Sequence, residues 1–456
     1  MDLVGLRLAP SLTAGVIAYL HSDQLGEALI VFAAMLAAMQ IIERAPFPLT
    51  LMPAARLALG LAAPVLAGAT LLAVTALAGH PAQVGEYTAA MIGAWMMLGL
   101  GAWTKARIER SAKVRVAVLG SHSFADDLRD ELRSSRVRAY EVIGWLGSEG
   151  PYRPGDATPW LGSLDQVRGA VLVNDIDLIV CAADREASPG TGPGAGVWER
   201  VAKACLDLPV RMLGANQFYE ELLGHIPIGT VDQAWYRYVL HPRFQSLEPV
   251  SKRVTDLVLA GVIGLLAAPL LALAALAVKL GDRGPVLYRQ RRLGEHGEPF
   301  DMLKLRTMAV DAEAAGVEWS GANDDRVTRV GRFLRRTHID ELPQLWNIAR
   351  GDMTLVGPRP ERPEMVAELE QQYSHYNRRH IFKPGIAGWA QLRCGYAGSE
   401  LGTGWKLCHD LYYIKYRSVL GDLLIVFETA FETFRDAHRA LRTPSERFIL
   451  EERTHG

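Results

Sequence analysis

The chain has 456 residues, which is enough for two or three folded units. Its formal net charge is −1, so it lacks the overall positive field that favours nucleic-acid binding, and no nucleic acid is expected as a partner. The four cysteines are scattered, and none shows C-x-x-C spacing. This argues against a structural zinc site and a disulfide framework, and it suits a reducing compartment.

The N-terminal part of the chain is dominated by apolar segments. Four can be distinguished, at residues 8–20, 25–42, 57–78 and 87–103. Lys and Arg occur in alternate loops and are absent from residues 21–24 and 79–85. Because basic loops stay in the cytoplasm, this pattern predicts a four-helix transmembrane bundle over residues 1–108 with both ends cytoplasmic. The segment centres contain no charged side chain, which argues against a transport pathway.

Residues 109–245 alternate between short apolar runs and amphipathic segments. Runs typical of strands occur at Val114–Leu119, Tyr140–Leu146, Asp177–Ala182 and Val210–Leu213, with helical segments at Ala125–Leu132 and Leu164–Val171. This alternation predicts a Rossmann-like α/β module with a parallel, doubly wound sheet. The turn that begins at Gly120 lacks the G-x-G-x-x-G pattern, so no dinucleotide site is predicted. A structural or regulatory role is favoured for the module.

The longest apolar run follows the basic pair Lys252–Arg253 and extends from Val254 to Leu280. About 20 apolar residues span the ~30 Å hydrocarbon core of a bilayer, so this run can enter a membrane. A second basic cluster follows it, and basic flanks remain on the cytoplasmic side. A helix that enters, bends at Pro269 and returns satisfies both flanks, because proline removes a helical hydrogen bond. We therefore predict a re-entrant helix over about residues 252–280, the alternative being an ordinary kinked transmembrane helix.

A pair of carboxylates, Asp340 and Glu341, stands just before Pro343 in the C-terminal region, residues 246–456. Proline is tolerated in the first turn of a helix, so a helix is predicted to begin near Asp340 or Glu341. The positive end of its dipole would keep the carboxylates ionised, and free N–H groups there suit a phosphate. A dense run of arginines, at positions 326, 329, 332, 335 and 336, precedes the pair. By itself the pattern also fits an ordinary helix start beside a solvated basic face.

Three further cations are distinguished by their sequence context. Arg359 lies between Pro358 and Pro360, so little entropy is lost when it binds a phosphate through two hydrogen bonds. Lys304 and Arg306 occupy alternate positions of a predicted strand and would point to the same side. The alternatives are a proline-rich turn with an exposed arginine and the solvent-facing side of a strand.

Together, many cations and two carboxylates beside a membrane-dipping helix fit a diphosphate substrate and a phosphate on a lipid. A carboxylate can act as a covalent nucleophile and divide one difficult displacement into two. Mg²⁺ would neutralise the diphosphate and favour in-line attack.

Several motifs of the C-terminal region occur in a specific order. They are Gln290-x-Arg-x-Gly294, Lys304-x-Arg-Thr-Met308, Asp340-Glu-Leu-Pro-Gln344, Gly351-x-Met353, Val356-Gly-Pro-Arg-Pro360, Lys383-Pro-Gly-x-x-Gly388, Tyr412–Tyr413 and Asp422. With the basic pair and the proline-broken helix, they make the region from Lys252 to about Thr429 resemble the bacterial sugar transferase family. These are polyprenyl-phosphate hexose-1-phosphate transferases with a monotopic catalytic domain, and the N-terminal parts resemble the family's large subclass. One departure is Ala268, where the family often has serine before the helix-breaking proline.

The resemblance implies a reaction and a role for each site residue. Asp340 would attack the β-phosphate of a UDP-sugar, release UMP and hold a phosphosugar covalently, with Glu341 as its dyad partner and Mg²⁺ near Asp340. The substrate-binding cations would be Lys304, Arg306, Arg335 and Arg359. Polyprenyl (undecaprenyl) phosphate would then attack and give polyprenyl-diphosphate-sugar. This is the first membrane step of exopolysaccharide, capsule or O-antigen synthesis.

The resemblance also implies the bacterial inner membrane, contacts with membrane lipids, and a catalytic domain that faces the cytoplasm. It leaves open a homodimer, the identity of the sugar and the role of the central module. Two other functions fit the residues. One is a lipid-phosphate hydrolase that uses the same basic site, and the other is a membrane-anchored nucleotide sensor built on residues 112–245.

Overall fold

The computed structural model describes most of the central module and of the C-terminal region. The described residues are Met52 and residues 113–134, 139–147, 158–182, 193–228, 231, 235, 239, 249–310, 312, 324–373, 376–394 and 400–434. Apart from Met52, the predicted four-helix bundle over residues 1–108 lies outside the described residues.

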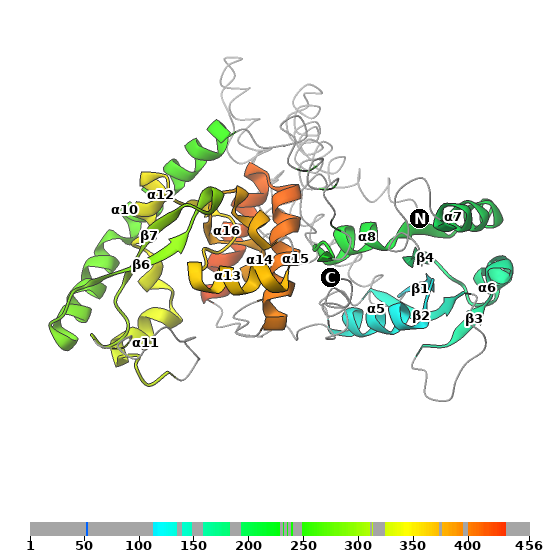
Figure 1. The fold of residues 1–456 in the computed structure, drawn as a ribbon, viewed down its shortest axis with the longest axis horizontal. Helices are drawn as coiled ribbons and strands as arrows, with labels where there is room; N and C mark the ends of the chain where they lie inside the picture. The colour runs from blue at the N-terminus through cyan, green and yellow to red at the C-terminus, as the bar shows by residue number, and fades with distance from the viewer. Residues whose placement is uncertain are drawn as a thin grey trace, which may run out of the picture. The chain divides into compact units, whose positions relative to one another are not determined.

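The central module contains a five-stranded sheet with helices between its strands (Figure 1). The strands are β1 (Val114–Leu119), β2 (Tyr140–Leu146), β3 (Trp160–Gly162), β4 (Leu178–Cys181) and β5 (Arg211–Gly214), in the order β3-β2-β1-β4-β5. The helices are α5 (His122–Ser134), α6 (Val167–Val173), α7 (Pro193–Ala204) and α8 (Ala215–Phe218). β1 pairs in parallel with β4, as do β2 with β3 and β4 with β5. The predicted parallel α/β sheet is therefore confirmed.

Both faces of this sheet are buried, which explains why its strands read as continuous apolar runs. Ala117 and Leu119 of β1 pack with Ile179 of β4 in a core that includes α6 and α7. Val116 and Val118 are also buried but lie outside that cluster, because successive strand residues point to opposite faces. The four predicted strands agree with β1, β2, β4 and β5 to within one residue. The sequence does not predict β3, because three residues are too few to show a periodic pattern.

α10 (Pro249–Asp282) is a single helix of 34 residues that contains Pro269, so the proline does not end it. Its surface is largely apolar and exposed, and Leu265 and Leu266, one turn before the proline, are 78% and 77% exposed. Within the described residues, Val250–Gly281 is the one helical stretch that is long and apolar enough to cross a membrane. Exposure of leucine on this scale is unfavourable in water, so the apolar surface of this helix fits association with a membrane.

The C-terminal domain combines two small sheets with helices (Figure 1). Strands β6 (Leu287–Leu293) and β7 (Pro299–Leu305) form an antiparallel hairpin, and β8 (Thr354–Val356) pairs with β9 (Gly385–Ala387) in parallel. The helices are α11 (Arg329–Arg336), α12 (Gln344–Arg350), α13 (Pro363–Gln372), α14 (Trp389–Cys394), α15 (Glu400–Tyr416) and α16 (Val419–Phe434). Two 3₁₀ segments, η8 (Ile339–Glu341) and η9 (Tyr376–Ile381), connect them. In Figure 1, α10 runs alongside the hairpin, α11 and α12.

Both ends of α10 pack against this one domain. Near its start, Asp256 is buried and accepts a hydrogen bond from the Thr354 hydroxyl of β8. Near its end, Val278 packs in a small core with Leu305 of β7 and Leu334 of α11. A helix that crossed the bilayer once would separate its ends by the ~30 Å hydrocarbon core. Contact of both ends with one domain therefore favours an arrangement in which they lie on the same side.

A buried polar network holds the start of α10. Lys252 Nζ lies 2.6 Å from Asp422 Oδ2 of α16 and 3.3 Å from Asp256 Oδ1. The Tyr413 hydroxyl of α15 lies 2.9 Å from the other Asp422 oxygen. Each carboxylate in the network thus has a cation or hydroxyl partner, as buried charges require. Lys252, one of the basic residues before the apolar run, therefore attaches α10 to α16. This contact is separate from its use as a basic flank in the topology prediction.

Candidate active site

The two carboxylates lie in a tight turn between α11 and α12. His338 adopts a left-handed conformation with φ 55°, which ends the preceding helix. Asp340 and Glu341 then form the 3₁₀ turn η8, and α12 begins only at Gln344, after Pro343. The prediction that a helix begins at the carboxylates is therefore wrong by three to four residues. The chain here closes i→i+3 hydrogen bonds, and proline has no N–H with which to continue an α-helical ladder.

α10 holds the other end of α12. Arg253 of α10 donates from Nη1 to the Ile348 carbonyl at 2.5 Å and from Nη2 to the Ala349 carbonyl at 2.8 Å. Gly351, with φ 101°, closes the helix in a conformation that favours glycine. A cation at the C-terminal end of a helix is stabilising. α12, and with it the turn that carries the carboxylates, is thereby tied to α10.

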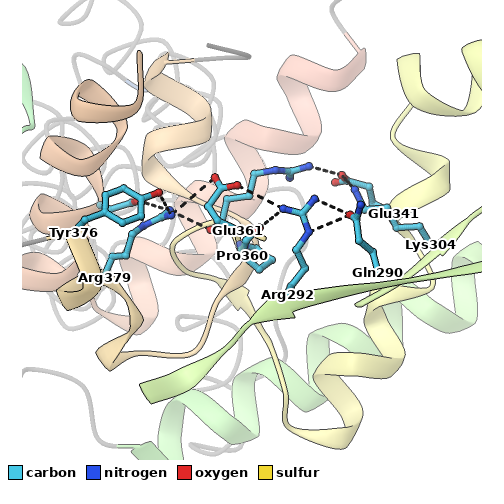
Figure 2. Close-up of polar contacts among 10 residues, drawn as sticks. Gln290, Arg292, Lys304, Glu341, Pro360, Glu361, Tyr376 and Arg379 are labelled. Carbon is cyan, nitrogen blue, oxygen red and sulfur yellow. Dashed lines mark hydrogen bonds and ion pairs between the residues drawn. The ribbon is translucent and has the colours of Figure 1, made fainter. Parts of the chain in front are cut away.

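Glu341 joins three segments that are distant in the sequence (Figure 2). Its Oε1 atom accepts hydrogen bonds from Lys304 Nζ at 3.0 Å and from Arg359 Nη2 at 2.8 Å. Lys304 comes from β7, and Arg359 comes from the proline-flanked segment that follows β8. The Glu341 side chain is only 9% exposed, so salt screens both ion pairs little. The structure thus brings together one predicted carboxylate and two predicted cations.

These contacts decide the charge state of Glu341. Burial opposes its ionisation, but the charges of Arg359 and Lys304 and their hydrogen bonds outweigh burial and hold its pKa well below its usual range. Burial lowers the pKa of Lys304, although Glu341 opposes that change. Glu341 is therefore an ionised carboxylate that already has two cationic partners.

Asp340, the predicted nucleophile, has a different environment. It is 6% exposed, and among the described residues none donates a hydrogen bond to its carboxylate. Burial raises its pKa to about 6, and the negative charge of Glu341 acts in the same direction. The expectation that a helix N-terminus would favour ionisation of Asp340 is therefore wrong, because α12 starts later and burial dominates. With a pKa of about 6, Asp340 is still mostly ionised at neutral pH.

The two remaining predicted cations differ in their placement. Arg335 donates from Nε to the Thr307 hydroxyl at 2.8 Å, and its charge helps to lower the pKa of Asp340 against the effect of burial. Arg306 is buried, and its guanidinium fills the space that a Cβ atom on Gly284 would occupy. The Arg306 guanidinium therefore lies directly against the Gly284 backbone. Arg335 lies near the carboxylates, whereas Arg306 is not among the charges that act on Asp340.

Comparison with known proteins decides the family. Residues 247–436 match the family model described as bacterial sugar transferase. A protein of Escherichia coli strain K12, named UDP-glucose:undecaprenyl-phosphate glucose-1-phosphate transferase, is 46% identical over 326 residues. That alignment covers 71% of this chain and 68% of the relative. The chain belongs to the bacterial sugar transferase family. The predicted resemblance is confirmed.

Other relatives of this bacterial sugar transferase match smaller parts of the chain. An Aeromonas hydrophila protein, named UDP-N-acetylgalactosamine-undecaprenyl-phosphate N-acetylgalactosaminephosphotransferase, is 39% identical over 236 residues. The match covers 52% of this chain and 55% of that relative, little more than half of its length. A Rhizobium leguminosarum bv. phaseoli protein, named exopolysaccharide production protein PSS, is 37% identical over 189 residues. It aligns over 94% of its own length with 40% of this chain.

The oxygen donors of this sugar transferase suit a cation that takes few protein ligands. Within the described residues, no group of three His, Cys, Asp or Glu side chains could hold a metal ion. Glu341 is already engaged by two cations, so Asp340 is the carboxylate that a metal could use. Mg²⁺ is commonly held by one or two carboxylates together with substrate phosphates and water. The residues therefore fit Mg²⁺ bound jointly with a diphosphate.

The sequence does not single out two buried charges of this sugar transferase, Arg379 of η9 and Asp410 of α15. Arg379 Nη2 lies 2.7 Å from Asp410 Oδ2, and neither side chain is more than 3% exposed. They are 31 positions apart and lie outside the motifs that suggest phosphate binding. A useful signal would be a charged residue at a position that the helical pattern predicts to be buried, because such charges are almost always paired.

Proposed function

We propose that this protein transfers a sugar-1-phosphate from a UDP-sugar to undecaprenyl phosphate, giving a polyprenyl-diphosphate-sugar and UMP. The observation that carries the proposal is Asp340, a buried carboxylate to which no described residue donates, next to the cations that Glu341 holds. The name of the Escherichia coli relative describes transfer of glucose-1-phosphate to undecaprenyl phosphate. The name of the Aeromonas relative describes transfer of N-acetylgalactosamine phosphate to undecaprenyl phosphate. The reaction would begin the synthesis of an exopolysaccharide, capsule or O-antigen, and the Rhizobium relative's name refers to exopolysaccharide production.

The residues support a reaction in two displacements. In the first, an Asp340 carboxylate oxygen attacks the β-phosphorus of the UDP-sugar, and the bond from that phosphorus to the bridging oxygen breaks, so UMP leaves. In the second, a phosphate oxygen of undecaprenyl phosphate attacks the same phosphorus, and the bond to Asp340 breaks. The carboxylate is regenerated, and the sugar-1-phosphate is joined to the lipid phosphate.

The cations supply charge stabilisation at both steps. Lys304, Arg335 and Arg359 act on Asp340 electrostatically, so they lie where phosphate oxygens would gather. Glu341 keeps Lys304 and Arg359 in place before substrate arrives, and it is the proposed dyad partner of Asp340. Arg306 lies against Gly284 and is not among the charges that act on Asp340, so its contact with a substrate phosphate stays a prediction.

Mg²⁺ is the proposed cofactor. Asp340 would hold it together with diphosphate oxygens, and when bound it would neutralise negative charge on the diphosphate. The displacement at phosphorus is carried by the carboxylate of this chain.

We place the protein in the bacterial inner membrane with the catalytic domain facing the cytoplasm, where UDP-sugars are made. Both ends of α10 contact the C-terminal domain, and both flanks are basic, which supports a re-entrant helix. Pro269 lies inside α10 at the centre of its exposed apolar surface, where a bend would be needed. The lipid phosphate would then reach Asp340 from the membrane surface.

The test separates the two half-reactions. The purified full chain in detergent is mixed with Mg²⁺ and each of a panel of UDP-sugars, without lipid acceptor. We expect release of about one UMP per site, as a covalent intermediate requires, and a phosphosugar attached to Asp340 that mass spectrometry locates. Asp340→Asn should abolish both, whereas Glu341→Gln should retain part of the first step and impair the full cycle.

Three results would contradict the proposal in different ways. An adduct on Asp340→Asn would exclude this residue as the nucleophile. UMP release only when undecaprenyl phosphate is present would indicate direct attack by the lipid. Release of inorganic phosphate from a lipid phosphate, without transfer, would indicate a hydrolase.

A further inference from the structure

The backbone that carries Arg359 is held by two arginines from other parts of the domain. Arg379 of η9 donates from Nη2 to the Arg359 carbonyl at 3.1 Å. Arg292 of β6 donates from Nη1 to the Pro360 carbonyl at 3.0 Å. Figure 2 shows Arg292 and Arg379 on opposite sides of the segment that contains Pro360 and Glu361. Two successive carbonyls therefore each receive a charged donor.

Arg379 has little freedom to move. Its Nε and Nη2 atoms both donate to Asp410 Oδ2, at 3.0 and 2.7 Å, and Nη1 donates to the Tyr376 hydroxyl at 2.8 Å. The Arg379 and Asp410 side chains are 3% and 2% exposed. A buried guanidinium with this many fixed partners acts as a rigid donor, because its planar fork allows few alternative geometries.

Arg292 is fixed in a similar way on the other side. Its Nε and Nη2 atoms donate to Gln290 Oε1 at 3.0 and 2.7 Å. Glu361 lies between the two arginines, with one oxygen 3.5 Å from Arg292 Nη1 and the other 3.9 Å from Arg379 Nη1. Glu361 thereby links the two arginines (Figure 2). We call Arg292, Glu361 and Arg379 together the arginine frame of this segment.

The arginine frame holds the main chain of Arg359, and the side chain of Arg359 contacts Glu341. Arg359 lies between two prolines and donates to Glu341 at 2.8 Å. A proline ring fixes its own φ angle, but the direction of a carbonyl group depends on the ψ angle of its residue. The hydrogen bonds to the Arg359 and Pro360 carbonyls therefore restrict the ψ angles that the prolines leave free. A displacement of about 1 Å in a group that binds the reacting phosphate can cost on the order of a hundredfold in rate. Fixing the Arg359 main chain thus fixes where its guanidinium lies.

We propose that Arg379, held by Asp410, and Arg292 are positioning residues that set the Arg359 guanidinium for phosphate binding. This rests on the proposed function, since it assigns Arg379 and Arg292 a role in the same transfer. The competing explanation is that the frame only stabilises the fold, and it predicts effects that do not depend on Arg359.

A double-mutant cycle distinguishes these explanations. Initial rates of UMP release are measured for Arg379→Lys and Arg292→Lys, each in the parent chain and in an Arg359→Ala background. Lysine keeps the charge but cannot reproduce the fork, so we expect about a tenfold loss of kcat/KM for each variant in the parent chain. In the Arg359→Ala background the further loss should be less than about twofold, because residues that act through one partner are not additive.

Matched measurements keep the test decisive. Arg378→Lys changes the exposed neighbour of Arg379 and should leave the rate within about twofold of the parent. Thermal melting in detergent identifies a variant that fails to fold, and if Arg379→Lys does, the cycle on the partly exposed Arg292 decides the outcome. Equal losses in both backgrounds, or near-normal rates for both lysine variants, would overturn the positioning role. A parent chain that releases no UMP from any UDP-sugar would instead overturn the proposed function.

Discussion

Glu341 and Arg359 form an ion pair of 2.8 Å at the centre of the site, and the same Glu341 oxygen also accepts from Lys304. This arrangement keeps two cations paired in a buried region, where an unpartnered charge would be strongly destabilising. It also leaves the neighbouring Asp340 as the carboxylate without a donor among the described residues. The two adjacent acidic residues thus have different environments, and this difference supports the separate roles proposed for them.

Arg359→Lys should lower the rate of UMP release by roughly ten- to hundredfold. Lysine cannot make two parallel hydrogen bonds to a phosphate, and a charge-assisted hydrogen bond contributes ~1.5–3 kcal/mol. Arg350→Lys, at a half-exposed arginine that pairs with Asp352, is the control for the loss of a guanidinium. Near-normal turnover of Arg359→Lys would show that Arg359 has a structural role in its turn and does not bind the phosphate.

Asp256→Ala should destabilise the protein by about 3 kcal/mol, because removal of one member of a buried charged network leaves its partners unsatisfied. Asp256 accepts from the Thr354 hydroxyl and lies 3.3 Å from Lys252 Nζ, so its loss weakens the attachment of α10 to β8. Denaturant unfolding in detergent measures the change. The neighbouring Thr255→Ala, whose hydroxyl donates to the Ser251 carbonyl within α10, is the control, and equal effects of both would argue against the network.

A re-entrant α10 places both of its flanks in the cytoplasm. Single cysteines introduced at Ser251 and at Arg289, both exposed, should resist a membrane-impermeant maleimide in intact cells and react after permeabilisation. The native cysteines are buried, so they should contribute little background. Asp23→Cys, in a loop that the charge pattern predicts to face outward, serves as the positive control. If only one flank were labelled from outside, the result would instead support a helix that spans the membrane once.

Acid should destabilise the fold partly through His380. Burial and the positive charge of Arg379 lower the pKa of this histidine to about 3. Between the ordinary value of 6.5 and about 3, the unfolded chain binds a proton that the folded chain does not. Stability should therefore fall as pH falls through this window, by up to about 1.4 kcal/mol per pH unit.

His380→Gln removes this contribution, so its melting temperature relative to the parent should rise steadily from pH 7 to pH 5. The exposed His296→Gln is the matched control. Parallel melting profiles for the parent and His380→Gln would show that this histidine is not responsible for acid sensitivity.

The sequence by itself determined the features that local patterns carry. Apolar runs located β1, β2, β4 and β5 to within a residue, because buried parallel strands need continuous apolar stretches. Length and hydropathy located α10, and the ordered motifs identified the family. The adjacency of Asp340 and Glu341 was also visible, because it needs no folding. The start of α12 was misjudged, because Pro343 is compatible with either the first helical turn or the residue before it.

Only the tertiary structure decided which charges meet. Lys304 and Arg359 are 37 and 18 positions from Glu341, and nothing local distinguishes Lys304, which reaches it, from Arg306, which packs on Gly284. The different environments of Asp340 and Glu341 likewise depend on burial and on distant cations. Electrostatic pairing in a low-dielectric interior acts over a few ångströms in space whatever the separation along the chain. A pattern in the sequence can therefore indicate charges that bind phosphate, but folding decides which of them share a site.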